Sequence, residues 1–284
     1  PAPDLTATPT LVHDGGNNGL FEGVVWLDEL GVLLFSDLTW QGSIPPSTIQ
    51  RLAPPSTVTV LLPSAGTNGL APAPDGTVIG AAHDVQGLVR IDPVTAERTV
   101  WVDNYLGGSF NSPNDLTVRS DGRVYFSDPD FQLGDRRSET GVTGLYTVAP
   151  NGTVTLLDDT LDNPNGVALS PDEAWLYVDD EGGSVWRYPL DGAGLAGARE
   201  PFATVPGPAD GMAMDCAGNL YVASHLQPDG RVNVLAPDGT TLGSVTTAAQ
   251  TTNLAFGGTE HRTLYVSAGR ALYAVALNLP GYPN

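Results

Sequence analysis

The sequence lacks lysine, contains a single cysteine and has no long hydrophobic run. Because Cys216 has no partner for an internal disulfide, the sequence indicates neither an oxidising nor a reducing compartment. No segment approaches the roughly 20 consecutive apolar residues of a membrane-spanning helix. We therefore expect a protein outside the membrane, either cytoplasmic or exported after removal of a leader that this chain does not contain.

Positive charge is also scarce, since 12 Arg residues stand against 32 Asp and Glu residues and give a formal net charge of −20. A surface of this sign repels polyanions, so we expect neither nucleic acid nor an anionic membrane face as a partner. A cationic ligand is compatible with the charge, although a solvated acidic surface explains most of it. For the assembly, we expect a monomer or a weak homodimer.

Amphipathic helices are hard to find, because apolar residues rarely recur at helical spacing over ten or more positions. Short apolar runs recur instead, and 34 Gly and 24 Pro residues separate them. These runs include VLLF (32–35), VYFS (124–127), LYVD (176–179), LYVAS (220–224) and LYVS (264–267). The pattern predicts an all-β protein.

Six segments of the sequence share one plan, which consists of a polar residue, a short strand, a tight turn and a second strand. Turns such as Pro-Asp-Gly (74–76) suit antiparallel hairpins, and two more apolar runs follow in most copies. The copies begin at Glu22, Asn68, Asn114, Asn165, Asp210 and Asn253, with spacings of 46, 46, 51, 45 and 43 residues. Four strands per unit at this period are typical of β-propeller blades around a central channel. The sequence therefore predicts one six-bladed β-propeller domain over residues 1–284, with four antiparallel strands in each blade.

The last copy is one strand short, because the chain ends soon after the run ALYAVALN (271–278). The segment TPTLVHD (8–14) precedes the first copy and has no blade of its own. We therefore expect residues 8–14 to complete the sixth blade and close the ring.

The polar residue that opens each copy lies at the start of an innermost strand, so six such residues should converge at one end of the channel. Two of them, Glu22 and Asp210, are carboxylates, and four are carboxamides. Oxygen ligands of this kind suit hard divalent cations such as calcium and magnesium, and a cation offsets repulsion between the two acids. Asn and Asp before a strand also form ordinary turns. Their recurrence in all six copies favours a functional centre over turn formation alone.

The segments that carry the repeat also carry a family resemblance. They are EGVVW (22–26), NGLAPAPDG (68–76), FNSPNDLTVRSDGRVYFSDP (110–129), NPNGVALSPDEAWLYV (163–178), ADGMAMDCAGNLYVAS (209–224) and TTNLAFGG (251–258). In order and spacing they resemble the gluconolactonase, regucalcin and senescence marker protein family of six-bladed propellers. The resemblance implies one divalent metal ion in the central channel and hydrolysis of sugar lactones. Paraoxonases and diisopropylfluorophosphatase-like phosphotriesterases are more distant relatives with a similar arrangement around calcium.

By motif, the resemblance implies that Glu22, Asn165 and Asp210 are metal ligands. Asn114 matches a substrate-side Asn that also reaches the metal, directly or through water. Calcium is the expected cation, and zinc, magnesium and manganese accept the same ligands. In the implied reaction the cation polarises the carbonyl of a lactone or related ester, and Asp210 orients or activates the attacking water. Nucleophilic attack by Asp210 on a phosphoryl substrate is an open alternative.

Four further residues are predicted to contact the substrate. Asn68 and Asn253 are the remaining ring members, and His83 and His225 follow the second strands of copies two and five, where either could donate a hydrogen bond or act as an acid. A different class of function also stays open, namely a propeller that binds a partner at its rim and holds only a structural ion. An open coordination position at the ring would distinguish the enzyme from this binding module.

The surroundings of Asn114 depart from the family pattern. Some members place a sugar-binding Arg just before this motif, whereas Ser109-Phe110 and Ser112-Pro113 occupy the neighbourhood here. The departure extends the expected substrates to lactones more apolar than gluconolactone. The aromatic residues considered as pocket walls are Trp40, Tyr105, Phe110 and Phe131, for which ordinary packing between blades is the favoured interpretation. The segment between Asp128 and Gly144, the longest interruption of the repeat, is either a lid or specificity loop or a tolerated insertion.

Overall fold

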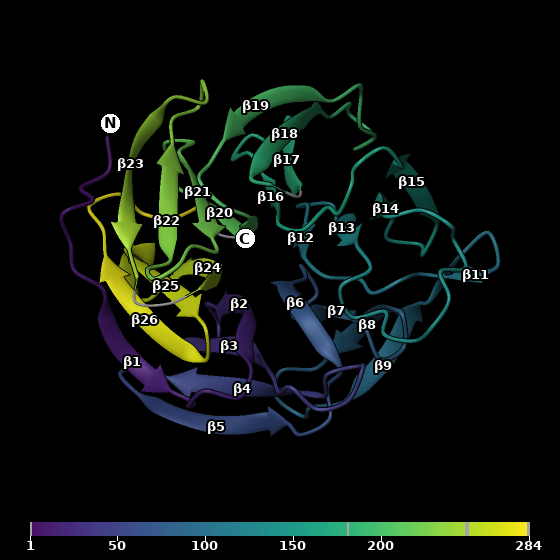
Figure 1. Cartoon of the computed structure of the whole chain (residues 1–284), viewed down its shortest axis with the longest axis horizontal. Coiled ribbons are helices and arrows are strands. Elements are labelled where there is room, and N and C mark those ends of the chain that lie inside the picture. Colours follow the sequence, from purple (N-terminus) through teal and green to yellow (C-terminus); the bar gives the residue numbers. More distant parts are fainter. Residues whose placement is uncertain (1, 181, 248–249, 283–284) are drawn as a thin grey trace.

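Six four-stranded antiparallel sheets stand around a central axis in the computed structural model, which describes residues 2–180, 182–247 and 250–282 (Figure 1). Each sheet is one blade, and the strand that opens each repeat lies next to the axis while the later strands lie progressively farther out. The architecture confirms the predicted all-β, six-bladed propeller. No helix in these described ranges is long and apolar enough to cross a membrane.

The strands of each blade follow the predicted repeats. Blade one contains β2 (Leu20–Leu27), β3 (Val32–Leu38), β4 (Ser47–Ala53) and β5 (Thr57–Leu62), and blade two contains β6 (Thr67–Pro72), β7 (Val78–Ala82), β8 (Gly87–Ile91) and β9 (Arg98–Val102). Blade three contains β12 (Leu116–Val118), β13 (Val124–Asp128), β14 (Gly144–Val148) and β15 (Val154–Asp158), and blade four contains β16 (Val167–Leu169), β17 (Trp175–Asp180), β18 (Ser184–Pro189) and β19 (Glu200–Thr204). Blade five contains β20 (Ala209–Met214), β21 (Leu220–Ser224), β22 (Arg231–Leu235) and β23 (Thr241–Thr246). A short hairpin of β10 (Asn104–Tyr105) and β11 (Gly108–Ser109) follows blade two, and the helix η1 (Thr259–His261) lies within blade six.

The sixth blade combines both ends of the chain. It contains β24 (Thr251–Gly257), β25 (Thr263–Ala268), β26 (Ala271–Ala276) and, outermost, β1 (Thr10–Asp14). β1 pairs antiparallel with β26, for example Thr10 with Ala274 and Asp14 with Ala271. The predicted closure of the ring by the N-terminal strand is therefore confirmed, and β26 does not remain an open edge.

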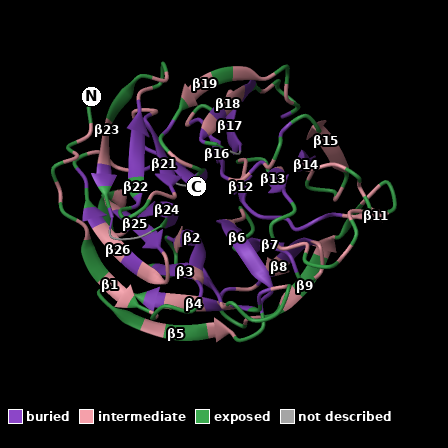
Figure 2. Cartoon of the chain, in the orientation of Figure 1, coloured by how far each residue is buried: buried purple, intermediate pink, exposed green. Residues whose placement is uncertain are grey.

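The hydrophobic core lies in six layers between neighbouring blades. In the layer between blades one and six, Phe21 and Phe35 pack against Tyr265 and Leu272, and the centroids of the two Phe rings lie 4.7 Å apart. The second strand of a blade is covered on both faces, so every residue of β7 and β13 is buried, including the polar Ser127 and Asp128 of β13. Figure 2 shows the inner strands largely buried and the outermost strands largely exposed or intermediate. The close-packed layers fix where each inner strand begins.

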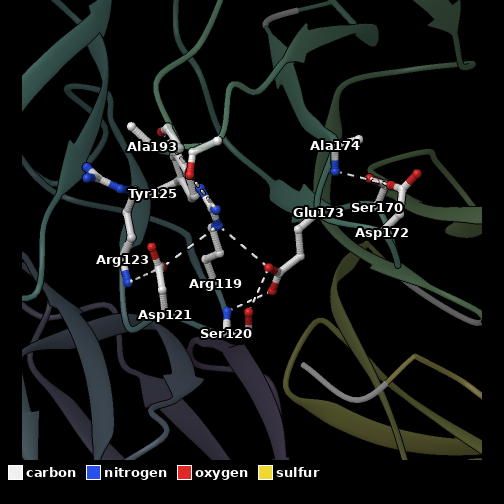
Figure 3. Close-up of polar contacts among 12 residues, drawn as sticks. Arg119, Ser120, Asp121, Arg123, Tyr125, Ser170, Asp172, Glu173, Ala174 and Ala193 are labelled. Atoms are coloured by element: carbon white, nitrogen blue, oxygen red, sulfur yellow. Dashed lines mark hydrogen bonds and ion pairs between the residues drawn. The ribbon is translucent and has the colours of Figure 1, made fainter.

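The turns that end the inner strands lie at the opposite end of the channel from the strand starts. There, Glu173 of blade four accepts hydrogen bonds from the backbone N–H and the hydroxyl of Ser120 of blade three, both at 2.7 Å (Figure 3). The Nε atom of Arg119 lies 3.5 Å from the same carboxylate. This contact ties blades three and four together at the end remote from the predicted ring.

Candidate functional site

The predicted ring residues occupy equivalent places, at or just before the start of the inner strands. Asn165 is half-buried and the other members are buried. The ring consists of Glu22, Asn68, Asn114, Asn165, Asp210 and Asn253. Their common position at one end of the channel matches the arrangement that the repeat predicts.

β-Bulges explain how polar residues fit into these apolar strands. In blades one, two, five and six the pairing of the first two strands shifts register at the ring position, as between Glu22 and Val25 or between Thr67 and Leu70. A bulge re-aims the side chain that it displaces. In blades three and four the strand begins only after the ring residue, at Leu116 and Val167. In both arrangements the ring residue is exempt from the alternation of side chains between the two faces of a regular strand.

Glycines that follow the ring residues let neighbouring blades approach closely. A Cβ atom on Gly23 would lie 2.1 Å from the backbone oxygen of Asn68 in the next blade. Corresponding close approaches occur at Gly69 toward Asn114, Gly166 toward Asp210 and Gly211 toward Asn253. Such distances exclude any larger side chain, so glycine here is a condition for convergence of the ring.

The two ring acids are close enough to interact electrostatically. Burial, followed by the charges of Asp210 and Asp115, raises the pKa of Glu22 well above its usual value. Gly211 donates its backbone N–H to Asp210 Oδ1 at 3.0 Å. Two buried carboxyl groups facing one channel are costly unless a positive charge or a proton compensates them.

Asp115 replaces the glycine at this position of blade three. Its Oδ2 atom accepts the backbone N–H of Val167 at 3.2 Å, and its carboxyl also interacts with the side chain of Asn253. Burial raises the pKa of Asp115 to about 7, against the lowering effect of hydrogen bonds from Leu116 and Val167. Asp115 therefore braces the ring across blades.

Asp179 is a fourth carboxyl group of this region that the sequence reasoning missed. It is fully buried, and its Oδ2 atom accepts the backbone N–H of Gly166 at 3.1 Å. Burial and the charges of Asp210 and Asp115 raise its pKa well above the usual value. The repeat aligns Asp179 with Ser127 of blade three, because the backbone N–H groups of Asn165 and Asn114 bond to the carbonyls of these two residues. The available signal was an acid at a position where blade three has a serine.

The chemistry of the ring fits a hard divalent cation. Among the described residues, buried side-chain oxygens without a hydrogen-bond partner include Glu22 Oε2, Asn68 Oδ1 and Asn165 Oδ1. Within the same described ranges, no three His, Cys, Asp or Glu side chains form a group able to hold a metal ion, so a site here depends on the carboxamides. Unpaired buried oxygens beside acids are the donors that calcium or magnesium takes.

His225 contacts a ring acid directly. Its Nε2 atom lies 2.6 Å from Asp210 Oδ2, and about a quarter of its side chain is exposed. Burial alone would lower the pKa of His225, but the charge and hydrogen bond of Asp210 outweigh burial and raise it. The pair can therefore hold and transfer a proton at the channel mouth.

His83 lies in a different setting. It is fully buried, and its Nε2 atom is 2.8 Å from the backbone oxygen of Pro45, so it joins blade two to the blade-one loop. Burial lowers the pKa of His83 and favours the neutral ring. Its contact with substrate stays a prediction that these interactions do not support.

The four aromatic residues divide between core and surface. Phe110 is fully buried, with its ring centroid 5.1 Å from that of Phe126, and Tyr105 packs edge-on against Tyr146. The packing interpretation is therefore confirmed for Phe110. Trp40 and Phe131 are about half exposed, at 53% and 48%.

The long loop of blade three brings a further polar residue to the ring. Gln132 Oε1 lies 3.5 Å from Asn114 Nδ2, at the limit of a hydrogen bond. The loop is anchored there because Gln132 donates its backbone N–H to Ser112 Oγ at 3.2 Å and Arg136 donates to its carbonyl at 2.8 Å. Sequence reasoning singled out the loop but not this residue, since an irregular segment has no periodicity to follow.

The family model described as the SMP-30/gluconolactonase/LRE-like region matches residues 20–270, which include the whole ring. The chain belongs to this family. The resemblance seen in the repeat is thereby confirmed. A gluconolactonase from Zymomonas mobilis subsp. mobilis is 34% identical over 287 residues, which cover 89% of this chain and 77% of the relative. A 6-deoxy-6-sulfogluconolactonase from Pseudomonas putida is 37% identical over 138 residues, which cover 41% of this chain and 47% of the relative.

Solved structures of family members have the same architecture. A gluconolactonase from Xanthomonas campestris matches with a TM-score of 0.84 at 28% identity, covering 99% of this chain and 95% of that one. Regucalcin from Agrobacterium tumefaciens, a calcium-binding protein, matches with a TM-score of 0.78 at 23% identity, covering 98% and 96%. The second likeness concerns the fold alone.

Proposed function

We propose that this lactonase of the SMP-30/gluconolactonase/LRE-like family opens the ring of sugar-acid lactones with a divalent cation held by Glu22, Asn114, Asn165 and Asp210. The gluconolactonase that aligns with 89% of the chain supports the lactone as substrate class. Calcium is the proposed cation because every protein ligand is an oxygen.

One observation carries the proposal of a metal. Glu22 Oε2 and Asn165 Oδ1 belong to the same ring as Asp210, and both oxygens are buried without a hydrogen-bond partner among the residues that the structure describes. An acidic cluster that only stabilised the fold would have its oxygens hydrogen-bonded. When bound, a divalent cation supplies Lewis-acid polarisation of the lactone carbonyl and stabilises the negative charge on its oxygen.

The remaining chemistry belongs to side chains of this chain. Asp210 orients the attacking water and accepts its proton, and His225, whose Nε2 atom is 2.6 Å from the carboxylate, shares that proton. When the bond between the carbonyl carbon and the ring oxygen breaks, the leaving alkoxide takes one proton back from this pair. The net reaction consumes one water and yields one hydroxy acid.

The polar groups around the ring suit a hydroxylated substrate. The four Asn residues of the ring surround the mouth with carboxamides, and Gln132 adds a fifth from the long loop. Carboxamides both donate and accept, so they can bind sugar hydroxyl groups in place of the Arg that some family members place before this motif. Asn68 and Asn253, with His225, are the proposed substrate contacts.

Lactone hydrolysis followed as acid release tests the proposed function. We expect δ-gluconolactone hydrolysis to be lost after exhaustive chelation and restored by calcium, with magnesium, manganese and zinc as parallel additions. A panel of phosphotriesters serves as the comparison substrate class. Full activity in the chelated protein would exclude the metal, and inactivity on every lactone and phosphotriester with every cation would favour a binding propeller.

Replacing Gln132 by Ala tests the substrate-side role of the loop. Losing one carboxamide contact should raise KM about fivefold, with kcat changed less than KM, because a neutral hydrogen bond contributes about 1 kcal/mol. Steady-state kinetics on δ-gluconolactone measure both constants. The matched control is Gln50→Ala, whose amide donates to Thr48 and Asp37 of blade one and to no ring residue. An unchanged KM in Gln132→Ala would remove this residue from the substrate site.

A further inference from the structure

We infer that Asp128 and Asp180 are positioning residues for the ring, each holding the turn that presents a ring Asn, and that they thereby set the affinity of the ring for a divalent cation. The inference rests on the proposed function, since it concerns the same cation. Neither residue belongs to the ring or was singled out by the repeat.

Asp128 clamps the turn before Asn114. Its Oδ2 and Oδ1 atoms accept the backbone N–H groups of Asn111 and Ser112, both at 2.9 Å, and all three residues are buried. Pro113 follows and has no N–H group of its own. The two oxygens of one carboxylate therefore fix the last two peptide N–H groups before the ring residue.

Asp180 repeats the arrangement before Asn165. Its Oδ2 and Oδ1 atoms accept the backbone N–H groups of Asp162 at 3.2 Å and Asn163 at 2.8 Å, and Pro164 follows. The two acids occupy equivalent positions in their blades. The backbone N–H of Asn114 bonds to the carbonyl of Ser127, which precedes Asp128. In the same way, the N–H of Asn165 bonds to the carbonyl of Asp179, which precedes Asp180. Blades three and four therefore share this arrangement, the clamp, in which both oxygens of one Asp accept the two backbone N–H groups that precede the proline.

The clamp occurs in the two blades in which the ring Asn follows a proline and precedes the inner strand. In blades three and four the ring residue lies outside the strand ladder, so the turn in front of it must hold it in place. At the corresponding position blade six has Ala268, and the other three blades use different contacts. Asp37 pairs with Arg270, His83 bonds to the Pro45 carbonyl, and His225 contacts Asp210.

The clamp of blade three also reaches the long loop. Ser112 donates its hydroxyl to the carbonyl of Pro129 at 2.7 Å, and the side chain of Asn111 donates to the carbonyl of Val142 at 2.7 Å. Burial raises the pKa of Asp128 to about 7, which is a cost of keeping a carboxylate here. The cost and the double hydrogen bond agree with a residue retained to hold this turn in one geometry.

Calcium titration of chelator-treated protein tests the inference with Asp128→Asn and Asp180→Asn. Each substitution keeps the size but turns one acceptor oxygen into an NH₂ group facing a backbone N–H. We expect each to raise the calcium Kd about tenfold or more, the usual effect of losing a partner that orients a metal ligand. Isothermal titration calorimetry measures Kd at a temperature at which circular dichroism shows every variant folded, and manganese is titrated in parallel.

The matched control is Asp158→Asn. Asp158 is also a largely buried carboxylate of blade three and accepts the backbone N–H of Thr160 at 2.8 Å, but it bonds to Tyr188 and Arg199 on blade four rather than to a turn of the ring. We expect its Kd to equal that of the wild type even if its melting temperature falls.

Wild-type protein that binds neither cation would overturn the proposed metal ring. Wild-type binding with unchanged Kd values in both clamp variants would overturn the positioning role alone, and Asp180→Asn decides the question if Asp128→Asn does not fold.

Discussion

Replacing Asp210 by Asn lowers kcat for lactone hydrolysis by about 1000-fold, within the range that a positioned general base contributes. An amide cannot take the proton of the attacking water. The substitution also removes the charged partner of His225, whose Nε2 atom lies 2.6 Å from Asp210 Oδ2 in the wild type. The fold should persist, because the charge of Asp210 contributes to the raised pKa of Glu22 and its removal relieves that repulsion. Steady-state kinetics measure the loss of kcat, thermal melting of the chelated protein measures stability, and calcium titration establishes whether the variant still binds the cation.

The control for this substitution lies at the opposite end of the channel. Glu173→Gln also neutralises an inter-blade carboxylate, the one that accepts hydrogen bonds from Ser120 in Figure 3. Its kcat should equal that of the wild type. Near-wild-type kcat in Asp210→Asn with calcium still bound would show that Asp210 is neither the base nor the water-orienting group.

Deleting residues 1–14 lowers the melting temperature by about 10–20 °C or prevents folding. The deletion removes β1 and leaves the edge of β26 unpaired, and it also strips the packing of Leu5 and Val12 from the blades. The lost hydrogen bonds and burial amount to about 5 kcal/mol, a large part of the stability of a typical domain. Differential scanning calorimetry measures the shift, and size-exclusion chromatography detects aggregation through the exposed edge.

A shorter deletion separates the strand from the segment that precedes it. Removing residues 1–9 leaves β1 paired with β26 and loses the contacts of Leu5 and Ala7. Its melting temperature should fall much less than that of the longer deletion. Equal melting temperatures for the full chain and the 1–14 deletion would refute closure of the ring by β1.

Much of the fold could be predicted from the sequence because a propeller repeats its plan. The turn residues, the apolar runs and a spacing near 46 residues recur six times, so the weak evidence for each strand adds up. The same repetition aligned Glu22 with Asp210 and with the four Asn residues. Convergence of the ring followed from the symmetry of the fold rather than from the properties of any one residue.

Residues that break the repeat were harder to foresee. Gln132 belongs to an irregular loop whose path depends on Ser112 and Arg136, so its proximity to Asn114 could not be read from spacing. His83 and His225 occupy similar places in the repeat, yet one is buried against Pro45 and the other reaches a ring acid. Neighbouring loops of different length produce this difference.

The sequence by itself determined the number of blades, the closing strand and the identity of the six ring residues, because these depend on periodicity and local turn chemistry. Tertiary structure decided which oxygens of the ring have hydrogen-bond partners, how Asp115 and Asp179 add to its charge, and which carboxylates hold the turns before Asn114 and Asn165. These properties depend on burial and on contacts between residues far apart in the chain. A repeat can align such residues, but only packing of the blades brings their atoms to a bonding distance or keeps them apart.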